Sequence, residues 1–217
     1  MKKLILLILL LSFIIKAQDV TIGTQTWTSK NLDESKFRNG EAIPLAKTNA
    51  EWETAGRNKQ PAWCYYENKE EKGTTYGKLY NWYAVNDPRG LAPNGYHIPT
   101  DEEWATLITY LGGSSIAGGK MKNTSGWKSN GYGTNESGFA GLPGGFRWFN
   151  GGFGYSIGND GEWWSSSEDG TTNPSNGNLY ALSIRLYNHD GSAGRCSYGW
   201  EAFGSKGKGF SVRCLRD

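Results

Sequence analysis

The sequence predicts an α+β fold, and three segments support that prediction. Residues 100–111 have the pattern of a capped amphipathic helix, and residues 179–186 alternate between two kinds of side chain, as a strand does. Residues 210–215 again place apolar side chains at every second position. Long stretches rich in glycine and tryptophan separate these elements. We therefore expect a single domain with a small twisted antiparallel sheet, two or so helices and long loops.

The helix has the clearest sequence signals of any element. Thr100 is a favourable N-cap, and Glu103 three residues later completes a capping box. Apolar side chains follow at helical spacing, namely Trp104, Leu107, Ile108 and Leu111. Two glycines then end the helix. An acidic first turn suits the positive end of a helix, so we do not assign catalysis to Asp101, Glu102 and Glu103.

Weaker elements are predicted on both sides of this helix. Two short strands flank a turn at Gly23 and Thr24, and a second helix spans about residues 115–121. Residues 67–75 are charged and have the composition of a loop. The stretch 123–177 carries many aromatic rings, which favours an ordered, irregular loop region joined by short strands. We expect the strand at 179–186 to be half-buried, with one apolar face formed by Tyr180, Leu182, Ile184 and Leu186.

The first 17 residues are typical of a secretory signal peptide. Lys2 and Lys3 precede an apolar run over residues 4–15, and the small residue Ala17 marks the expected cleavage site. The run is shorter than the roughly 20 residues that a membrane-spanning helix needs. We expect residues 18–217 to be secreted, or to lie in the periplasm or on the outer surface, soluble and without a membrane span. A retained membrane anchor is the alternative.

Charge and composition narrow the class of partner. The formal net charge is +2, and removal of the three lysines of the first 17 residues leaves −1. A nucleic acid partner is not expected, because binding to phosphates needs a basic surface. The chain has 31 Gly and 10 Trp. That composition is typical of many tight turns, and of either a core of large rings or an exposed aromatic surface for ligands.

The three cysteines allow one disulfide in an oxidising compartment. Cys214 shares a strand face with apolar residues, so we expect it to point inward. We predict a disulfide between Cys196 and Cys214, with Cys64 and Cys214 as the alternative pair. A thiol active site is not expected, because the sequence has no Cys-x-x-Cys and its only candidate partners are His97 and His189. We expect His97 to be a core or hydrogen-bonding residue.

Aromatic and acidic residues of the glycine-rich region are the candidate ligand-binding residues. Sugar rings stack on exposed aromatic side chains, and flanking polar side chains bind the hydroxyl groups. On this reasoning the ligand-binding residues are Trp148, Phe149, Trp163, Asp160, Glu162, Glu168 and Asp169. The alternative is that most of the rings fill the core. No cofactor is expected except calcium, for which acidic residues beside glycine make weak candidates of Asp160, Glu162 and Asp190.

Several stretches match one known family in order along the chain. They are residues 22–27 with 31–32, 76–85, 91–104, 137–147, 164–168 and 211–214. On these stretches the chain resembles the Fibrobacter succinogenes major paralogous domain family. The resemblance implies a C-type-lectin-like fold, related also to sulfatase-modifying factors, in mostly secreted proteins of Bacteroidota. It leaves the activity open, because the family has no settled one.

Three functions are compatible with these observations. The first is a secreted, non-catalytic binding module for a glycan or a surface protein. The second is a structural component of the envelope or matrix. The third is a metal-dependent oxidase of the sulfatase-modifying-factor type, which needs a reactive cysteine pair or three histidines, and this chain has only two histidines. We therefore expect that the protein is not an enzyme.

Overall fold

The computed structural model describes residues 19–131, 133–154, 156–172, 179–197 and 206–217. Its helices are α1 (Asn49–Arg57), η1 (Tyr66–Asn68), α2 (Glu70–Tyr76), α3 (Trp82–Val85), α4 (Asp101–Tyr110), α5 (Ser114–Met121) and η2 (Lys128–Asn130). Its strands are β1 (Asp19–Ile22), β2 (Gln25–Thr28), β3 (Trp63–Cys64), β4 (Leu79–Tyr80), β5 (Tyr96–His97), β6 (Asp160–Thr172), β7 (Leu179–Tyr187), β8 (Ala193–Ser197) and β9 (Leu215–Arg216). The fold is α+β, as predicted. The signal peptide predicted for residues 1–17 lies outside the described residues.

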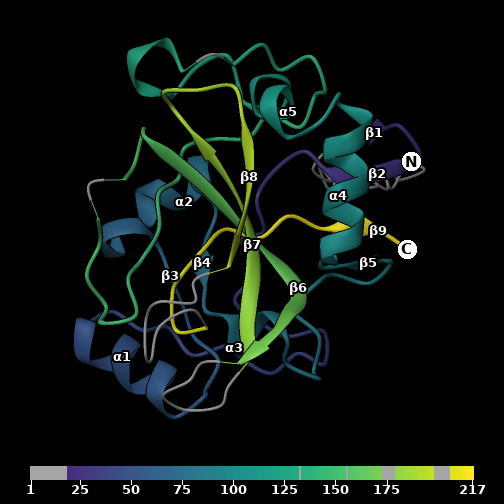
Figure 1. Ribbon diagram of the computed structural model, residues 1–217. Coiled ribbons are helices and arrows are strands. Elements are labelled where there is room, and N and C mark those ends of the chain that lie inside the picture. The colour runs from purple at the N-terminus through teal and green to yellow at the C-terminus, as the bar shows by residue number, and fades with distance from the viewer. Residues whose placement is uncertain (1–18, 132, 155, 173–178, 198–205) are drawn as a thin grey trace, which may run out of the picture.

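In the described part of the chain the strands form three small antiparallel sheets rather than one. The first has the order β1-β2-β9-β5, the second is the pair β3-β4, and the third has the order β6-β7-β8. β6 and β7 run through the middle of the molecule, with α4 at one side and α1 and α3 near one end (Figure 1). β9, near the C-terminus, pairs with both β2 and β5, so it joins the hairpin of β1 and β2 to β5 in one sheet.

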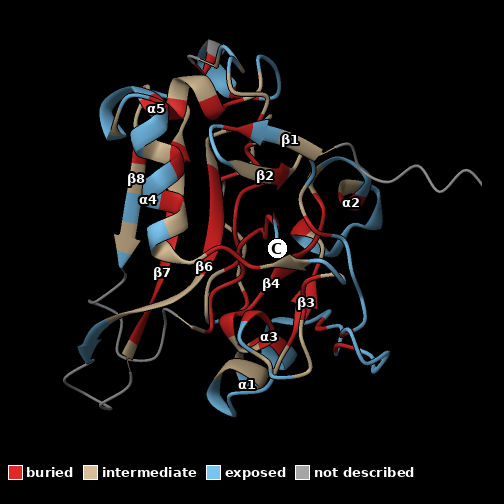
Figure 2. Cartoon of the chain, turned by 90° about the vertical axis from the view of Figure 1, so that its right-hand side faces the viewer, coloured by how far each residue is buried: buried red, intermediate tan, exposed pale blue. Residues whose placement is uncertain are grey.

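Helix α4 confirms the capping prediction. The Thr100 side chain accepts the backbone N–H of Glu103, and the Glu103 carboxylate accepts the backbone N–H of Thr100. Trp104 and Leu107 are completely buried, whereas the outer face of α4 is exposed (Figure 2). The second predicted helix is α5. The local sequence pattern therefore places both helices correctly.

Strand β7 is buried on both faces, so the half-buried prediction is wrong. Tyr180, Leu182, Ile184 and Leu186 are buried, but Ala181 and Ser183 of the opposite face are buried too. β7 pairs with β6 on one side and with β8 on the other, and the aromatic core covers its second face. Alternation in sequence therefore marks the two faces of β7 but does not mark one of them as solvated.

The glycine-rich region ends in a long strand that the sequence did not predict. β6 covers 13 residues, with two register shifts against β7 between Trp164 and Thr172. Its serines and glycines favour strands weakly, so pairing with β7 and burial of its tryptophans form the strand. The strand predicted over residues 210–215 is less regular than expected. Only β9 is regular strand there, and residues 209–211 form isolated bridges. Phe210, Val212 and Cys214 are nevertheless buried, as predicted.

Among the described residues, large rings fill the interior in three clusters. One lies between α4 and the sheets, where the rings of Trp27 and Trp104 approach to 4.6 Å. Another surrounds Trp164 and Phe210, whose rings are 4.3 Å apart. The third lies under α1, around Trp52. The abundant tryptophans are thus mainly core residues.

Candidate functional site

The aromatic residues predicted to bind ligand are not equivalent. Trp163 is completely buried, its ring packs on Phe139, and its indole N–H donates to the Asn31 side chain at 2.8 Å. The prediction that Trp163 stacks on a ligand is therefore wrong, because the buried indole has no surface open to solvent. Trp148 and Phe149 are half-buried, and Trp148 packs edge-to-face on Phe146 at 4.7 Å.

The predicted acidic residues form two separate groups. Asp160 and Glu162 lie on β6 beside Arg185 of β7, which reaches Asp160 at 3.0 Å and Glu162 at 3.9 Å. Glu162 is buried and accepts the Ser183 hydroxyl at 2.7 Å. Near the other end of β6, Glu168 pairs with Lys206, and Asp169 accepts the hydroxyls of Thr171 and Ser197. The seven predicted residues therefore do not form one site.

The calcium candidates do not come together either. Asp190 lies in the turn after β7, where its carboxylate accepts the backbone N–H and the hydroxyl of Ser192. Asp160 pairs with Arg185 instead. Within the part of the chain that the structure describes, no three His, Cys, Asp or Glu side chains are grouped as a metal site requires.

The predicted disulfide is not formed, and each of the three cysteines carries a thiol. Cys214 is buried in the core around Phe210, whereas Cys196 lies on the edge strand β8 opposite Ser183. Cys64 belongs to a different buried cluster from Cys214. Burial raises the pKa of Cys64 to about 11 and that of Cys214 to about 12. These two thiols are therefore poor nucleophiles at neutral pH.

His97 is a hydrogen-bonding residue, as predicted. Its Nδ1 lies 2.8 Å from an Asp217 carboxylate oxygen, and its Nε2 lies 2.8 Å from a Glu103 carboxylate oxygen. The ring thus connects β5, the start of α4 and the end of the chain. Both ring nitrogens are occupied by the protein itself, so His97 is part of the scaffold in this arrangement.

A recess beside β3 has the composition of a ligand site. It measures about 380 Å³ and is lined by Ser35, Leu45, Lys47, Trp63, Tyr65, Asn68, Glu70 and Lys78. We call it the Trp63–Tyr65 recess. The rings of Trp63 and Tyr65 meet edge-to-face at 5.2 Å, and the Trp63 indole N–H donates to the Ile43 carbonyl at 2.9 Å. The two rings are therefore held in one fixed arrangement.

Gly73 of α2 fixes the Tyr65 ring from behind. A Cβ at position 73 would lie 2.2 Å from Cε1 of Tyr65, so only glycine lets the ring pack against this helix. The buried ammonium group of Lys78 also lies near both rings, 4.6 Å from the Trp63 ring centre and 4.9 Å from that of Tyr65. The same ammonium group pairs with Asp33 at 2.6 Å, so its charge is balanced within the protein.

The backbone beside this recess has an unusual conformation. Glu67 and Asn68 have φ values of 55° and 56°, in the left-handed region that side-chain-bearing residues seldom adopt. The Asn68 N–H donates to the Tyr65 carbonyl at 2.9 Å, which closes the turn. Such backbone strain concentrates at binding sites, and here it places the Asn68 side chain in the recess wall.

Polar side chains in the recess wall are available to a ligand. Five of these side chains form no hydrogen bond or ion pair with any other described residue. They are those of Ser35, Lys47, Tyr65, Asn68 and Glu70. The set contains a cation, a carboxylate, an amide and two hydroxyls. It can therefore both donate and accept hydrogen bonds around a half-buried aromatic ring.

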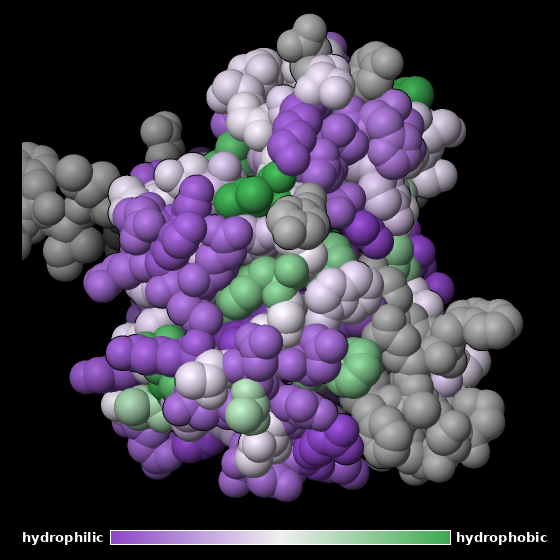
Figure 3. Space-filling model, turned by 90° about the vertical axis from the view of Figure 1, so that its left-hand side faces the viewer, coloured by the Kyte–Doolittle hydropathy of each residue, from purple (hydrophilic) through white to green (hydrophobic). Residues whose placement is uncertain are grey.

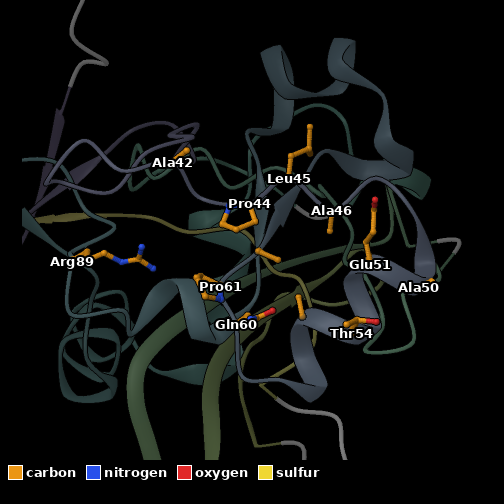
Figure 4. A pocket seen from close by; sticks show the side chains of 12 residues that line it. Ala42, Pro44, Leu45, Ala46, Ala50, Glu51, Thr54, Gln60, Pro61 and Arg89 are labelled. Atoms are coloured by element: carbon orange, nitrogen blue, oxygen red, sulfur yellow. The ribbon is translucent and has the colours of Figure 1, made fainter.

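A second recess lies on the other side of residues 44–46, against helix α1 (Figure 4). It measures about 630 Å³ and is lined largely by small apolar side chains, with Glu51, Thr54, Gln60 and Arg89 as its polar members. We call it the α1 recess. Arg89 donates to Asp87 and Glu41, and Glu51 accepts the backbone N–H groups of residues 47 and 48. Leu45 lines both recesses and is 41% exposed.

Sequence reasoning missed the Trp63–Tyr65 recess, although one signal for it was present. Trp63 and Tyr65 stand at period two in a strand-forming segment, so both rings project from the same face. Residues 67–75, interpreted as a loop, contain most of α2, and this helix supplies Gly73 and Glu70. The recess depends on four separate chain segments, which a local pattern does not bring together.

Comparison with known families identifies the class of this chain. The fold is an α+β domain of small antiparallel sheets, and its sequence matches the Fibrobacter succinogenes major domain over residues 20–216. The chain belongs to the Fibrobacter succinogenes major domain family. Comparisons with curated proteins and with solved structures gave no match. Over the described residues, no helix is both long enough and apolar enough to cross a membrane.

Proposed function

We propose that this chain is a secreted, non-catalytic binding module of C-type-lectin-like fold, and that the Trp63–Tyr65 recess binds a glycan. The observation that carries the proposal is the Tyr65 ring, held by Gly73 and surrounded by polar side chains without partners among the described residues. A sugar presents an apolar ring face edged by hydroxyl groups. A fixed aromatic ring beside mixed donors and acceptors matches that chemistry.

The character of the surface supports a polar ligand. The face that lies on the left of Figure 1 is mainly hydrophilic, and hydrophobic side chains reach it only in small separate areas (Figure 3). Large partner proteins usually dock on wider apolar patches. A non-catalytic role is supported by the high pKa of the buried thiols and by the carboxylate partners of His97. A protein ligand remains the second candidate.

A glycan array tests the proposal with matched variants. The purified protein should bind at least one class of immobilised glycan, and Tyr65→Ala should weaken that binding at least about fivefold, because stacking contributes on the order of 1 kcal/mol or more. Tyr110→Ala is the matched control, since Tyr110 is 65% exposed on α4. Equal loss in both variants, or no binding to any glycan by the unmodified protein, would contradict the proposal.

Secretion is tested separately from binding. The exported protein should begin at Gln18, as N-terminal sequencing of the culture medium or periplasmic fraction will report. Recovery of an uncleaved chain in the membrane fraction would instead support a retained anchor.

A further inference from the structure

We infer that the ligand is a neutral, linear oligosaccharide that crosses Leu45 and occupies both the Trp63–Tyr65 recess and the α1 recess. This inference rests on the proposed glycan-binding function and specifies the ligand further. A single sugar would need only the Trp63–Tyr65 recess. Two recesses that share one exposed side chain form a continuous surface, which suits a chain of sugars.

The backbone between the two recesses is open to a ligand. The Trp63 N–H donates to the Pro44 carbonyl, and the Ala46 N–H donates to the Trp63 carbonyl. The carbonyl of residue 44 and the N–H of residue 46 therefore point toward β3. The N–H and C=O of Leu45, which lies between them, point away from β3. Among the described residues, nothing bonds to either backbone group of Leu45. A sugar hydroxyl passing over Leu45 can use both.

The α1 recess offers the kinds of contact that the next sugars need. Its floor consists of alanine and proline side chains, which can meet the apolar faces of sugar rings, as Figure 4 shows around Pro44 and Pro61. The side chains of Thr54 and Gln60 have no hydrogen-bond partner among the described residues. They supply donors and acceptors at the α1 side and the lower edge of the recess.

Charge pairing indicates that the ligand is uncharged. Lys78 is balanced by Asp33, and Arg89 is balanced by Asp87 and Glu41. Lys47 and Glu70 contribute one charge of each sign to the first recess. The carboxylate of Glu51 is held at the positive end of α1. Lys47 has no ion-pair partner among the described residues, but with the partners of Lys78 and Arg89 included the two recesses carry more carboxylates than cations. A neutral glycan therefore fits this surface better than an acidic one.

A length series tests the inference by calorimetry. The probes are mono-, di-, tetra- and hexasaccharides of one neutral sugar, taken from the class that the array identifies, or of glucose and N-acetylglucosamine if several classes bind. Affinity should increase at least about tenfold from disaccharide to hexasaccharide, because added subsites act together. It should change less than about twofold between low and high salt.

A filling variant separates the two recesses. Thr54→Trp occupies the α1 recess and should reduce hexasaccharide affinity to about the disaccharide value, while leaving disaccharide affinity unchanged. Ala105→Trp, on the exposed face of α4, is the control for added surface bulk. Thermal unfolding of both variants checks that they fold.

The outcomes distinguish this inference from the proposed function. No binding of any saccharide would contradict both the proposed function and this inference. Binding that Tyr65→Ala weakens, but that neither chain length nor Thr54→Trp alters, would overturn the inference alone. Tighter binding of a uronic acid or sulfated analogue than of its neutral counterpart would overturn the assignment of an uncharged ligand.

Discussion

At the scale of single residues, buried cations stabilise irregular backbone in this protein. The guanidinium group of Arg213 is completely buried and donates to the carbonyls of Thr28, Phe139 and Ala140 and to the Asn31 side chain. Arg147 does the same for the carbonyls of Ala46, Thr48 and Gly151. Long loops leave carbonyls without ladder partners, and a five-donor side chain can satisfy several of them at once.

Replacing Arg213 should therefore destabilise the protein strongly. Arg213→Met removes these donors and leaves buried carbonyls unsatisfied, so we expect a loss of about 3–5 kcal/mol in the free energy of unfolding. Urea unfolding at neutral pH measures it. Arg57→Met, at an exposed ion pair on α1, should cost less than about 1 kcal/mol. Similar losses in both variants would contradict this account.

His97 should make stability depend on pH. Burial lowers the pKa of His97, but its hydrogen bonds to Asp217 and Glu103 outweigh this effect, so the pKa is raised above its ordinary value. Protonated His97 is thus favoured in the folded state. Its contribution is complete below the unfolded-state pKa of about 6.5 and is lost as the pH rises through the folded-state pKa.

Thermal unfolding of His97→Gln against the unmodified protein measures this effect. The difference in melting temperature should be largest near about pH 5.5 and should shrink toward about pH 8.5. His189→Gln is the control, because His189 is exposed. A difference that is constant over this range would show that the ring acts only by packing.

At the scale of elements, the residues that cap the start of α4 also connect this helix to the rest of the fold. The Glu103 carboxylate uses one oxygen to cap the helix and the other to bind His97. The helix start is thereby joined to β5, and β5 pairs with β9. The same carboxylate therefore serves the helix and the closing sheet.

The Thr100 cap can be tested on its own. Thr100→Ala removes the hydroxyl that accepts the Glu103 N–H and should cost about 1 kcal/mol in the free energy of unfolding. Thr106→Ala is the matched control, because among the described residues the Thr106 hydroxyl bonds only back to the carbonyl of Glu102 within α4. Chemical denaturation should show little change for this control. An equal cost in both would contradict a specific capping role.

At the scale of the whole molecule, packing of large rings takes the place of a disulfide. Trp27, Trp52, Trp104, Trp163 and Trp164 are each fully buried. They join helices and sheets that are distant in sequence, such as α4 with β2 and β6 with the segment before β9. A covalent link is not needed to hold a domain with a core of this size.

The thiols should respond as this packing implies. Under native conditions an alkylating reagent should modify half-buried Cys196 much faster than buried Cys64 and Cys214, and all three should react once the protein is unfolded. Mass spectrometry of peptides reads the result. The melting temperature should be the same with and without a reducing agent. A lower melting temperature in reductant would reveal a disulfide and contradict the arrangement described above.

Sequence reasoning succeeded where the signal is local and failed where it is not. The cap at Thr100 and the inward-facing Phe210, Val212 and Cys214 follow from spacing within one segment. The Cys196–Cys214 pair and the stacking role of Trp163 were wrong, because each depends on which distant residues cover that side chain. The Trp63–Tyr65 recess was missed for the same reason.

The sequence by itself determined the α+β class, the limits of α4 and α5, and membership of the family. The helix limits depend on residues within one stretch, where hydrogen bonds and side-chain contacts lie within a few positions. The fold class and the family follow from several such stretches in order along the chain. Only the tertiary structure decided that β7 is covered on both faces, that β6 extends over 13 residues, and that Tyr65 lies against Gly73. Burial and recesses arise between segments far apart in the chain, and the contacts there outweigh local propensity.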